Sequence, residues 1–310
     1  MYGNGNIAKE GFDHVRIPMG WHHYTDSAPA FAIKESFFKR VEQQLDLAEK
    51  HKLAAIINIH HFEEFTSNPK TERERLMNIW EQVATRFKNR PLSVAFEILN
   101  EPKDVADAAV MNDVFAEVVK RIRKIDDKRL LIVGPEKWNG IEGLPSLKVP
   151  DDDRVAVTVH CYEPFLFTHQ GATWTEGMGS VTGVEYPQPG SKKIPVPGDA
   201  PDWVQDNVKQ YNRNVDSQTA GEPAFKPLLR QAAEWGQKNN RPIYVGEFGA
   251  FTTATPEDRA AFYRDYRIAS EEQGLGWCIW DWKAGFRYWD REKNAPAPGM
   301  REALFGKGGN

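Results

Sequence analysis

The 310-residue sequence contains little cysteine, no concentration of positive charge and no long apolar run. Its two cysteines, Cys161 and Cys278, lie in apolar, strand-like segments and give no basis for a disulfide framework. Because the formal net charge is −4 and no segment gathers lysine or arginine, we expect no nucleic-acid partner. No apolar run reaches the ~20 residues that span a bilayer, so we expect no membrane partner either. No signal peptide is visible.

Tryptophan, in contrast, is abundant. The chain has ten tryptophans, and aromatic residues make up 12% of it, which is more than core packing alone requires. Four tryptophans lie among polar residues and glycines, where we expect loops: Trp21, Trp138, Trp174 and Trp282. Flat apolar rings that line a cleft suit the C–H faces of sugars, so a neutral carbohydrate substrate fits this composition.

Short β-branched runs alternate with longer amphipathic stretches, a pattern that predicts βα units and a parallel sheet. The expected strands are 13–18, 54–60, 94–100, 130–134, 155–160, 242–247 and 276–280. Expected helices include one capped by Ser36, and others at 72–88, 107–125, 224–238 and 256–273, the last capped by Thr255. No linker or repeat divides the chain, so we expect one barrel domain over residues 1–310.

One segment interrupts this alternation. Residues 177–223 contain five prolines between 187 and 201 amid Gly, Asp and Asn. A long loop of this composition inside a compact domain is usually functional or disordered. We interpret it as a loop insert that forms one wall of a cleft, with mobile decoration as the alternative.

Polar side chains follow one expected strand after another. They are Arg16; His60 and His61; Asn100 and Glu101; Trp138 and Asn139; His160, Cys161 and Tyr162; Glu247; and Trp280. In a parallel barrel the carboxyl ends of all strands point to one face, where the active site is built. Taken singly, each of these residues can equally be a structural strand end. Together they indicate a site.

Glu101 and Glu247 are the carboxylates of this set. Two carboxylates on one rim allow glycosidic cleavage, in which one is a protonated acid and the other an ionised nucleophile. Arg16 near the nucleophile would keep that nucleophile ionised, Tyr162 could donate a hydrogen bond to it, and His160 could tune the acid. A salt-bridged strand end is the alternative for either glutamate alone. We expect no metal and no cofactor, because the H-E-x-x-H spacing is absent.

These residues carry a resemblance to a known family. The motifs "ILNEP", "HCYEP" and "VGEFG", with "DHVRIP" before and "WCIWDW" after, resemble glycoside hydrolase family 5, over about residues 11–286. "IINIHHFEE" and "YEPFLFTHQGATW" are most similar to its bacterial endoglucanase branch. The resemblance implies a TIM-type (β/α)8 barrel that cleaves β-1,4-glucan with retention, ~5–5.5 Å between the carboxyl groups, and a secreted or periplasmic location.

Carried over by position, the resemblance implies that Glu101 is the acid/base and Glu247 the nucleophile. It implies that Asn100 binds the sugar 2-hydroxyl and that Trp280 stacks under the sugar at the cleaved bond. The other site residues of the family would be Arg16, His60, His160 and Tyr162. We add as subsite candidates His61, Trp138, Phe165 and Trp174.

The sequence departs from the family pattern at both the start of the chain and the insert. The first barrel strand and most of its helix are not recognised, and "NIAKEGF" matches that helix's last turn followed by the second strand. An open barrel edge would favour a homodimer. The insert leaves substrate choice open: an endo-β-1,4-mannanase or dual glucanase/mannanase, an inactive carbohydrate-binding barrel and a metal-dependent hydrolase remain alternatives.

Overall fold

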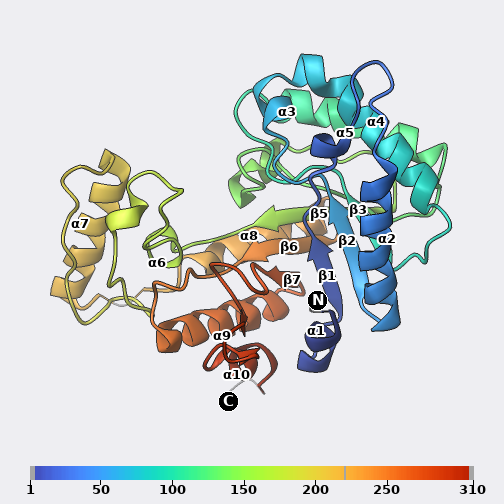
Figure 1. The fold of residues 1–310 in the computed structure, drawn as a ribbon. Helices are drawn as coiled ribbons and strands as arrows, with labels where there is room; N and C mark the ends of the chain where they lie inside the picture. The colour runs from blue at the N-terminus through green and yellow to red at the C-terminus, as the bar shows by residue number, and fades with distance from the viewer. Residues whose placement is uncertain (1–3, 220, 307–310) are drawn as a thin grey trace. The chain divides into compact units, whose positions relative to one another are not determined.

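The computed structural model describes residues 4–219 and 221–306. The chain forms two compact units, one of residues up to 160 with 234–244, the other of residues 161–233 with those from 245 onward. Seven strands follow one another in a single sheet in their sequence order, β1 to β7 (Figure 1). This is the strand order of a (β/α) barrel, which confirms the predicted fold class. Within the described residues, no helix is long and apolar enough to cross a membrane.

Among its described residues, the first unit contains five complete strands, each parallel to the next. They are β1 (His14–Ile17), β2 (Ala54–Asn58), β3 (Val94–Glu97), β4 (Leu131–Val133) and β5 (Val155–His160). Its helices are α1 (Asn4–Glu10), η1 (Trp21–Tyr24), α2 (Glu35–Lys50), α3 (Glu63–Ser67), α4 (Pro69–Phe87), α5 (Ala108–Arg123) and η2 (Ile141–Ser146). As predicted, a short helical segment leads directly into the first described strand.

The chain passes between the units within α8 (Phe225–Lys238) and β6 (Ile243–Phe248). The second unit also contains α6 (Phe165–Thr168), η3 (Met178–Ser180), α7 (Asp202–Ser217), α9 (Pro256–Glu272), β7 (Gly276–Ile279), β8 (Trp289–Asp290), β9 (Ala295–Pro296) and α10 (Met300–Phe305). The seven predicted strands are confirmed, and each predicted end lies within three residues of the observed one.

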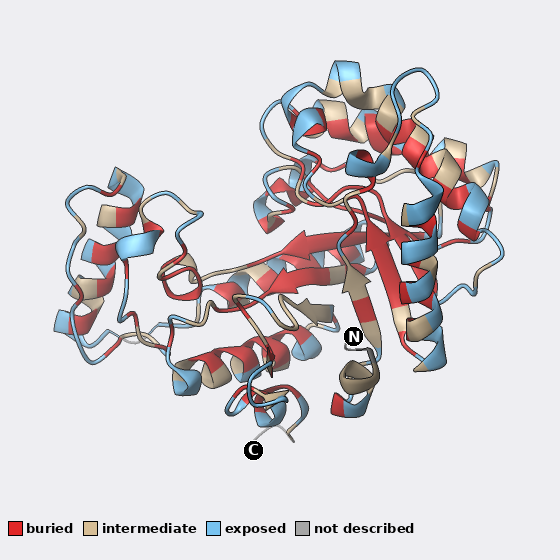
Figure 2. Cartoon of the chain, in the orientation of Figure 1, coloured by how far each residue is buried: buried red, intermediate tan, exposed pale blue. Residues whose placement is uncertain are grey.

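Strands β3 and β5 of the first unit are buried at every residue (Figure 2), as expected for strands that are covered on both faces. On the inner face, Ile56, Ala95, Ile132 and Ala156 form one layer, against which Tyr244 packs. Small and branched side chains alternate in this layer, so the interior is filled rather than open. The layer holds the strand ends in fixed register.

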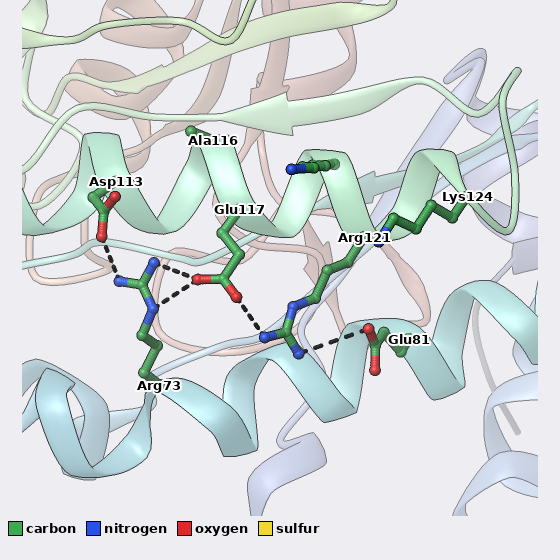
Figure 3. A pocket seen from close by; sticks show the side chains of 8 residues that line it. Arg73, Glu81, Asp113, Ala116, Glu117, Arg121 and Lys124 are labelled. Carbon is green, nitrogen blue, oxygen red and sulfur yellow. Dashed lines mark hydrogen bonds and ion pairs between the residues drawn. The ribbon is translucent and has the colours of Figure 1, made fainter.

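An ion-pair network joins α4 to α5 and lines the surface pocket drawn in Figure 3. Arg73 pairs with Asp113 at 2.8 Å and with Glu117, and Arg121 pairs with Glu117 and, at 3.1 Å, with Glu74. Burial acts to raise the pKa of Glu117, but hydrogen bonds from Arg73 and Arg121 outweigh it and lower that pKa. These carboxylates are engaged by arginines, so we assign the network to helix packing.

Two predictions about helices were wrong. Helix α2 begins at Glu35 and its cap is Lys34, whose carbonyl accepts from the amides of Phe37 and Phe38, so Ser36 lies inside the helix and does not cap it. The insert is not one continuous loop, because α7 occupies sixteen of its residues. By contrast, the predicted cap of α9 is confirmed: the hydroxyl of Thr255 accepts from the amide of Asp258 at 3.1 Å.

Candidate active site

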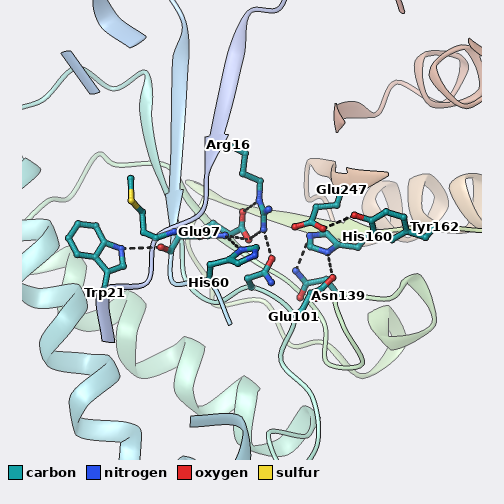
Figure 4. A network of polar contacts seen from close by, with 12 residues as sticks. Arg16, Trp21, His60, Glu97, Glu101, Asn139, His160, Tyr162 and Glu247 are labelled. Atoms are coloured by element: carbon teal, nitrogen blue, oxygen red, sulfur yellow. Dashed lines mark hydrogen bonds and ion pairs between the residues drawn. The ribbon is translucent and has the colours of Figure 1, made fainter. Parts of the chain in front are cut away.

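The first unit has seven polar side chains at the carboxyl ends of its strands, which we call the Glu101 cluster; Figure 4 labels Arg16, His60, Glu97, Glu101 and His160 among them. It consists of Arg16, His60, His61, Glu97, Asn100, Glu101 and His160. Arg16 on β1 donates from Nε to Glu97 Oε2 at 2.6 Å and from Nη2 to Glu97 Oε1 at 2.5 Å. The side chains of this pair are 2% and 1% exposed. A buried, bidentate pair of this kind holds both groups in one geometry.

Arg16 also orients Asn100. Its Nη2 donates to Asn100 Oδ1 at 2.6 Å, and the amide of Asn100 donates to the carbonyl of Ile59 at 2.9 Å. Asn100 is 1% exposed, and its Nδ2 has no hydrogen-bond partner among the described residues. A buried donor without a partner is costly, so Nδ2 is an available donor for a ligand hydroxyl.

Burial shifts the pKa of the Glu101 carboxyl group. Burial raises its pKa to about 7, against the lowering effects of His61, Arg16 and Lys103. Its side chain remains 16% exposed, and Oε1 lies 2.8 Å from Nδ1 of His160. A carboxyl group with this pKa is protonated below pH 7 while still reachable from solvent, which suits a general acid.

The histidines of the cluster differ in environment. Burial, Arg16 and the other histidines lower the pKa of His60 to about 2, so this ring is neutral. His61 is exposed, and its ring centroid lies 4.1 Å from that of His60. His160 contacts Glu101, which agrees with its predicted role beside the acid. The first unit therefore brings the predicted residues Arg16, His60, His61, Asn100, Glu101 and His160 together.

The second unit holds the other carboxylate. Glu247 lies in β6 and is 4% exposed, and Oε2 accepts a hydrogen bond from the hydroxyl of Tyr162 at 2.8 Å (Figure 4). The carbonyl of Glu247 accepts from the amide of Cys161 at 3.1 Å, so backbone and side chain fix this contact together. A phenol that donates to a carboxylate favours its ionised form. The predicted contact of Tyr162 is confirmed in geometry.

Trp280 is held beside Glu247 by the backbone. Its amide donates to the carbonyl of Phe248 at 2.8 Å. A Cβ at Gly249 would lie 2.2 Å from the carbonyl oxygen of Trp280, so only glycine permits this approach. The second glycine of "VGEFG" is therefore required by packing.

The aromatic candidates vary in exposure. Trp138 in the first unit is 54% exposed, and Trp174 in the second is 60% exposed, with its ring edge-on to Phe251 at 4.8 Å. The ring of Phe165 stacks on that of His169, with 4.0 Å between the ring centroids. Trp203 of α7 lies edge-on to the ring of Phe165, at 6.0 Å between centroids. Exposed rings of this kind are available to stack on sugar rings.

Glu97 was not among the residues that the sequence indicated for the site, and Asn139 was indicated without a role. Glu97 was read as part of a strand, although a glutamate in a buried run signals an ion-pair partner elsewhere. Asn139 was noted only as a strand-end residue, yet its Nδ2 lies 3.5 Å from Nε2 of His160. No local pattern distinguishes it from any other loop asparagine.

Metal binding finds little support within either unit. Among the residues described here, no three His, Cys, Asp or Glu side chains of one unit lie close enough to hold an ion together. Glu101 and His160 of the first unit and Glu247 of the second are of the residue types that metals bind. The expected absence of a metal stays a prediction.

Comparison with known proteins shows which family the chain belongs to. The family model Cellulase (glycosyl hydrolase family 5) matches residues 3–285. The chain is 29% identical to endoglucanase C of Acetivibrio thermocellus over 290 residues, covering 89% of this chain and 82% of that one. It is 28% identical to cellodextrinase A of Ruminococcus flavefaciens over 279 residues, covering 87% and 74%.

Solved structures agree with this assignment. Cel5A of Thermotoga maritima in complex with mannotriose matches with a TM-score of 0.83 and 34% identity, over 97% of this chain and 89% of that one. Cellulose synthase subunit Z (CcsZ) of Clostridioides difficile matches with a TM-score of 0.84 and 29% identity, over 98% and 92%. The family model spans most of the chain, and the motifs it covers include both glutamates. This chain belongs to glycosyl hydrolase family 5, the cellulase family of glycoside hydrolases.

Proposed function

We propose that the protein is a retaining endo-β-1,4-glucanase in which Glu101 is the acid/base and Glu247 the nucleophile. The observation that carries this proposal lies at the end of β5. His160 contacts Glu101, and Tyr162, two residues further, contacts Glu247. One short segment thus serves both carboxylates, and endoglucanases stand among the chain's relatives.

The reaction proceeds in two steps. In the first, Glu247 attacks the anomeric carbon, and protonated Glu101 gives its proton to the leaving oxygen as the glycosidic bond breaks. In the second, Glu101, now ionised, takes a proton from water, whose oxygen attacks the anomeric carbon and releases Glu247. Two inversions restore the original configuration. The raised pKa of Glu101 and the hydrogen bond that Tyr162 gives to Glu247 match these different tasks.

The other candidate site residues assist substrate binding. The free Nδ2 of Asn100 is placed to donate to a sugar hydroxyl, and we assign it the 2-hydroxyl. We assign Arg16 to orienting Asn100 and to favouring ionised Glu247. Neutral His60, together with His61, would contact the sugar at the cleaved bond, and Trp280 would stack beneath it. Trp138, Trp174 and Phe165 would extend the binding surface.

Mannan is a second candidate substrate. A structure that matches this chain, Cel5A of Thermotoga maritima, holds mannotriose. Glucan and mannan differ in the orientation of the 2-hydroxyl. A site that accepts both polysaccharides therefore binds this hydroxyl only loosely. We therefore include dual glucanase/mannanase activity as the second proposal.

The test is hydrolysis of a polysaccharide panel. Wild type should release reducing ends from carboxymethylcellulose and barley glucan, while release from glucomannan measures the second proposal. Glu101→Gln and Glu247→Gln should each remove nearly all turnover, with Glu222→Gln, on an exposed ion pair, as the matched control. Substantial activity in either site variant would overturn the assignment. Binding without sugar release would favour the inactive carbohydrate-binding alternative, and loss of activity in chelator the metal-dependent one.

Location and assembly complete the proposal. We propose that the protein acts outside the cytoplasm, because an insoluble glucan is hydrolysed where it lies. The homodimer predicted from an open barrel edge also stays a proposal. Sizing in solution tests it: a dimer supports pairing of copies, and a stable monomer contradicts it.

A further inference from the structure

An unusual backbone conformation follows β4, at residues 137–139. Lys137, Trp138 and Asn139 have φ of 60°, 57° and 57°, so three successive non-glycine residues are left-handed. Each such residue is strained by about 1 kcal/mol or more unless it is asparagine or glycine. The turn is held by the amide of Trp138, which donates to the carbonyl of Pro102 at 3.1 Å, next to Glu101. Strain that the surrounding structure maintains points to a positional role.

The turn directs Asn139 onto His160 by two contacts. The carbonyl of Asn139 accepts from the amide of His160 at 2.8 Å, and its Nδ2 lies 3.5 Å from Nε2 of the ring. Asn139 is fully buried. Its amide packs against Gly134, where a Cβ would lie 2.8 Å from Oδ1. Backbone and side chain of one residue thus both address His160.

The amide orientation sets the proton on the ring. With Nδ2 toward His160, the Oδ1 of Asn139 is left without a partner among the described residues. The reverse orientation would leave an amide nitrogen with two buried donors, which is the costlier arrangement. Nε2 therefore accepts, and Nδ1 carries the hydrogen that His160 donates to Glu101 Oε1 at 2.8 Å.

We propose that Asn139 is a positioning residue that holds His160 as the neutral Nδ1–H tautomer, so that Glu101 keeps its proton and serves as the acid. The catalytic part of this inference rests on the proposed function. A donor at Nε2 opposes protonation there, and a protonated ring would place a cation 2.8 Å from the carboxyl group. That cation would favour ionised Glu101 and remove the acid.

Other charged groups near Glu101 and His160 also affect whether Glu101 keeps its proton. Glu101 faces His61, Arg16 and Lys103, which lower its pKa, and Glu97, which raises it. His160 faces Glu101 and the neutral ring of His60. The side chain of Asn139 contacts the ring of His160, so a change at Asn139 alters that ring without removing a charge from the site.

Two variants separate positioning from simple packing. Asn139→Gly removes the amide but suits the left-handed backbone, so the turn should persist. Asn139→Asp keeps the shape and replaces the donor with an acceptor. The matched control is Thr158→Val, a buried neighbour whose hydroxyl has no hydrogen-bond partner among the described residues and whose methyl also faces Gly134.

The experiment combines ¹⁵N NMR of labelled histidine rings with the pH dependence of kcat/KM. Wild type should show His160 as the Nδ1–H tautomer at neutral pH. In Asn139→Asp the ring should become protonated, and the basic limb of the profile should move down by about one pH unit. Asn139→Gly should show a mixture of tautomers and a smaller shift, and Thr158→Val neither change.

Outcomes distinguish this inference from the proposed function. An unchanged tautomer and an unchanged basic limb in both Asn139 variants would overturn the role of Asn139. If Asn139→Asp does not fold, Asn139→Gly decides by the same readouts. If wild type releases no sugar from any glucan, the proposed function fails, whereas the ring nitrogen shifts still report whether Asn139 sets the tautomer.

Discussion

The buried pair of Arg16 and Glu97 offers a sharp test of how the first unit is held together. Glu97→Gln removes the negative charge but keeps the shape of the side chain. It leaves the guanidinium, 2% exposed, with an amide oxygen and Asn100 as the remaining acceptors of its described bonds. Removing one partner of a buried ion pair is strongly destabilising, because the attraction within the pair no longer offsets the lost hydration of the guanidinium.

The expected loss follows from the geometry. Breaking a buried pair costs about 3–5 kcal/mol, and the retained oxygen of glutamine places this variant at about 3 kcal/mol. That loss changes the folding equilibrium constant by about a hundredfold. With an unfolding entropy of about 2.1 cal/mol/K per residue, a chain of this length should lose about 5 °C in Tm.

Calorimetry or thermal circular dichroism measures this loss. The matched control is Glu222→Gln, because Glu222 pairs with Arg230 at an exposed position where both side chains are 45% exposed. The control should leave Tm unchanged, since exposed pairs contribute little. If Glu97→Gln had the same Tm as the control variant, the view that this pair stabilises the first unit would be wrong.

Two further predictions concern the acid and a helix cap. The kcat/KM of wild type should fall as pH rises through about 7, because burial raises the pKa of Glu101 to about 7 and only its protonated form is the acid. Glu97→Gln should move this basic limb of the pH profile to lower pH, since the charge of Glu97 raises the pKa of Glu101. A basic limb that moved to higher pH would contradict the assignment. Thr255→Ala should lower the free energy of unfolding by about 1 kcal/mol, because the first-turn amide of Asp258 loses its acceptor. Unfolding in urea measures this loss, and an unchanged midpoint would contradict the capping role.

Much of the fold was predictable because strands and helices leave periodic patterns in a sequence. The continuous apolar run that ends at His160 predicted β5 to the residue. Helix α7 was missed because prolines and glycines precede it. Its own signal was present, since Val204, Val208, Tyr211 and Val215 recur at helical spacing and are buried.

The site was predictable where residues end strands and obscure where they come from irregular backbone. Glu101 and His160 follow apolar runs, so the barrel geometry alone predicted their meeting. Glu97 lies inside such a run, and its partner on β1 could be recognised only once β1 and β3 were placed in one sheet. Asn139 depends on three left-handed residues, a conformation that no local pattern in Lys137 and Trp138 predicts.

The central claim, that Glu247 forms a covalent intermediate released with the help of Glu101, can be tested by trapping. A 2-deoxy-2-fluoro-cellobioside with a dinitrophenolate leaving group slows both steps but needs little acid assistance in the first. Mass spectrometry of the intact protein followed by peptide mapping should find one fluorocellobiosyl group on Glu247, and on no residue in Glu247→Gln. A label on another carboxylate, or turnover without any adduct and with inverted product, would contradict the account.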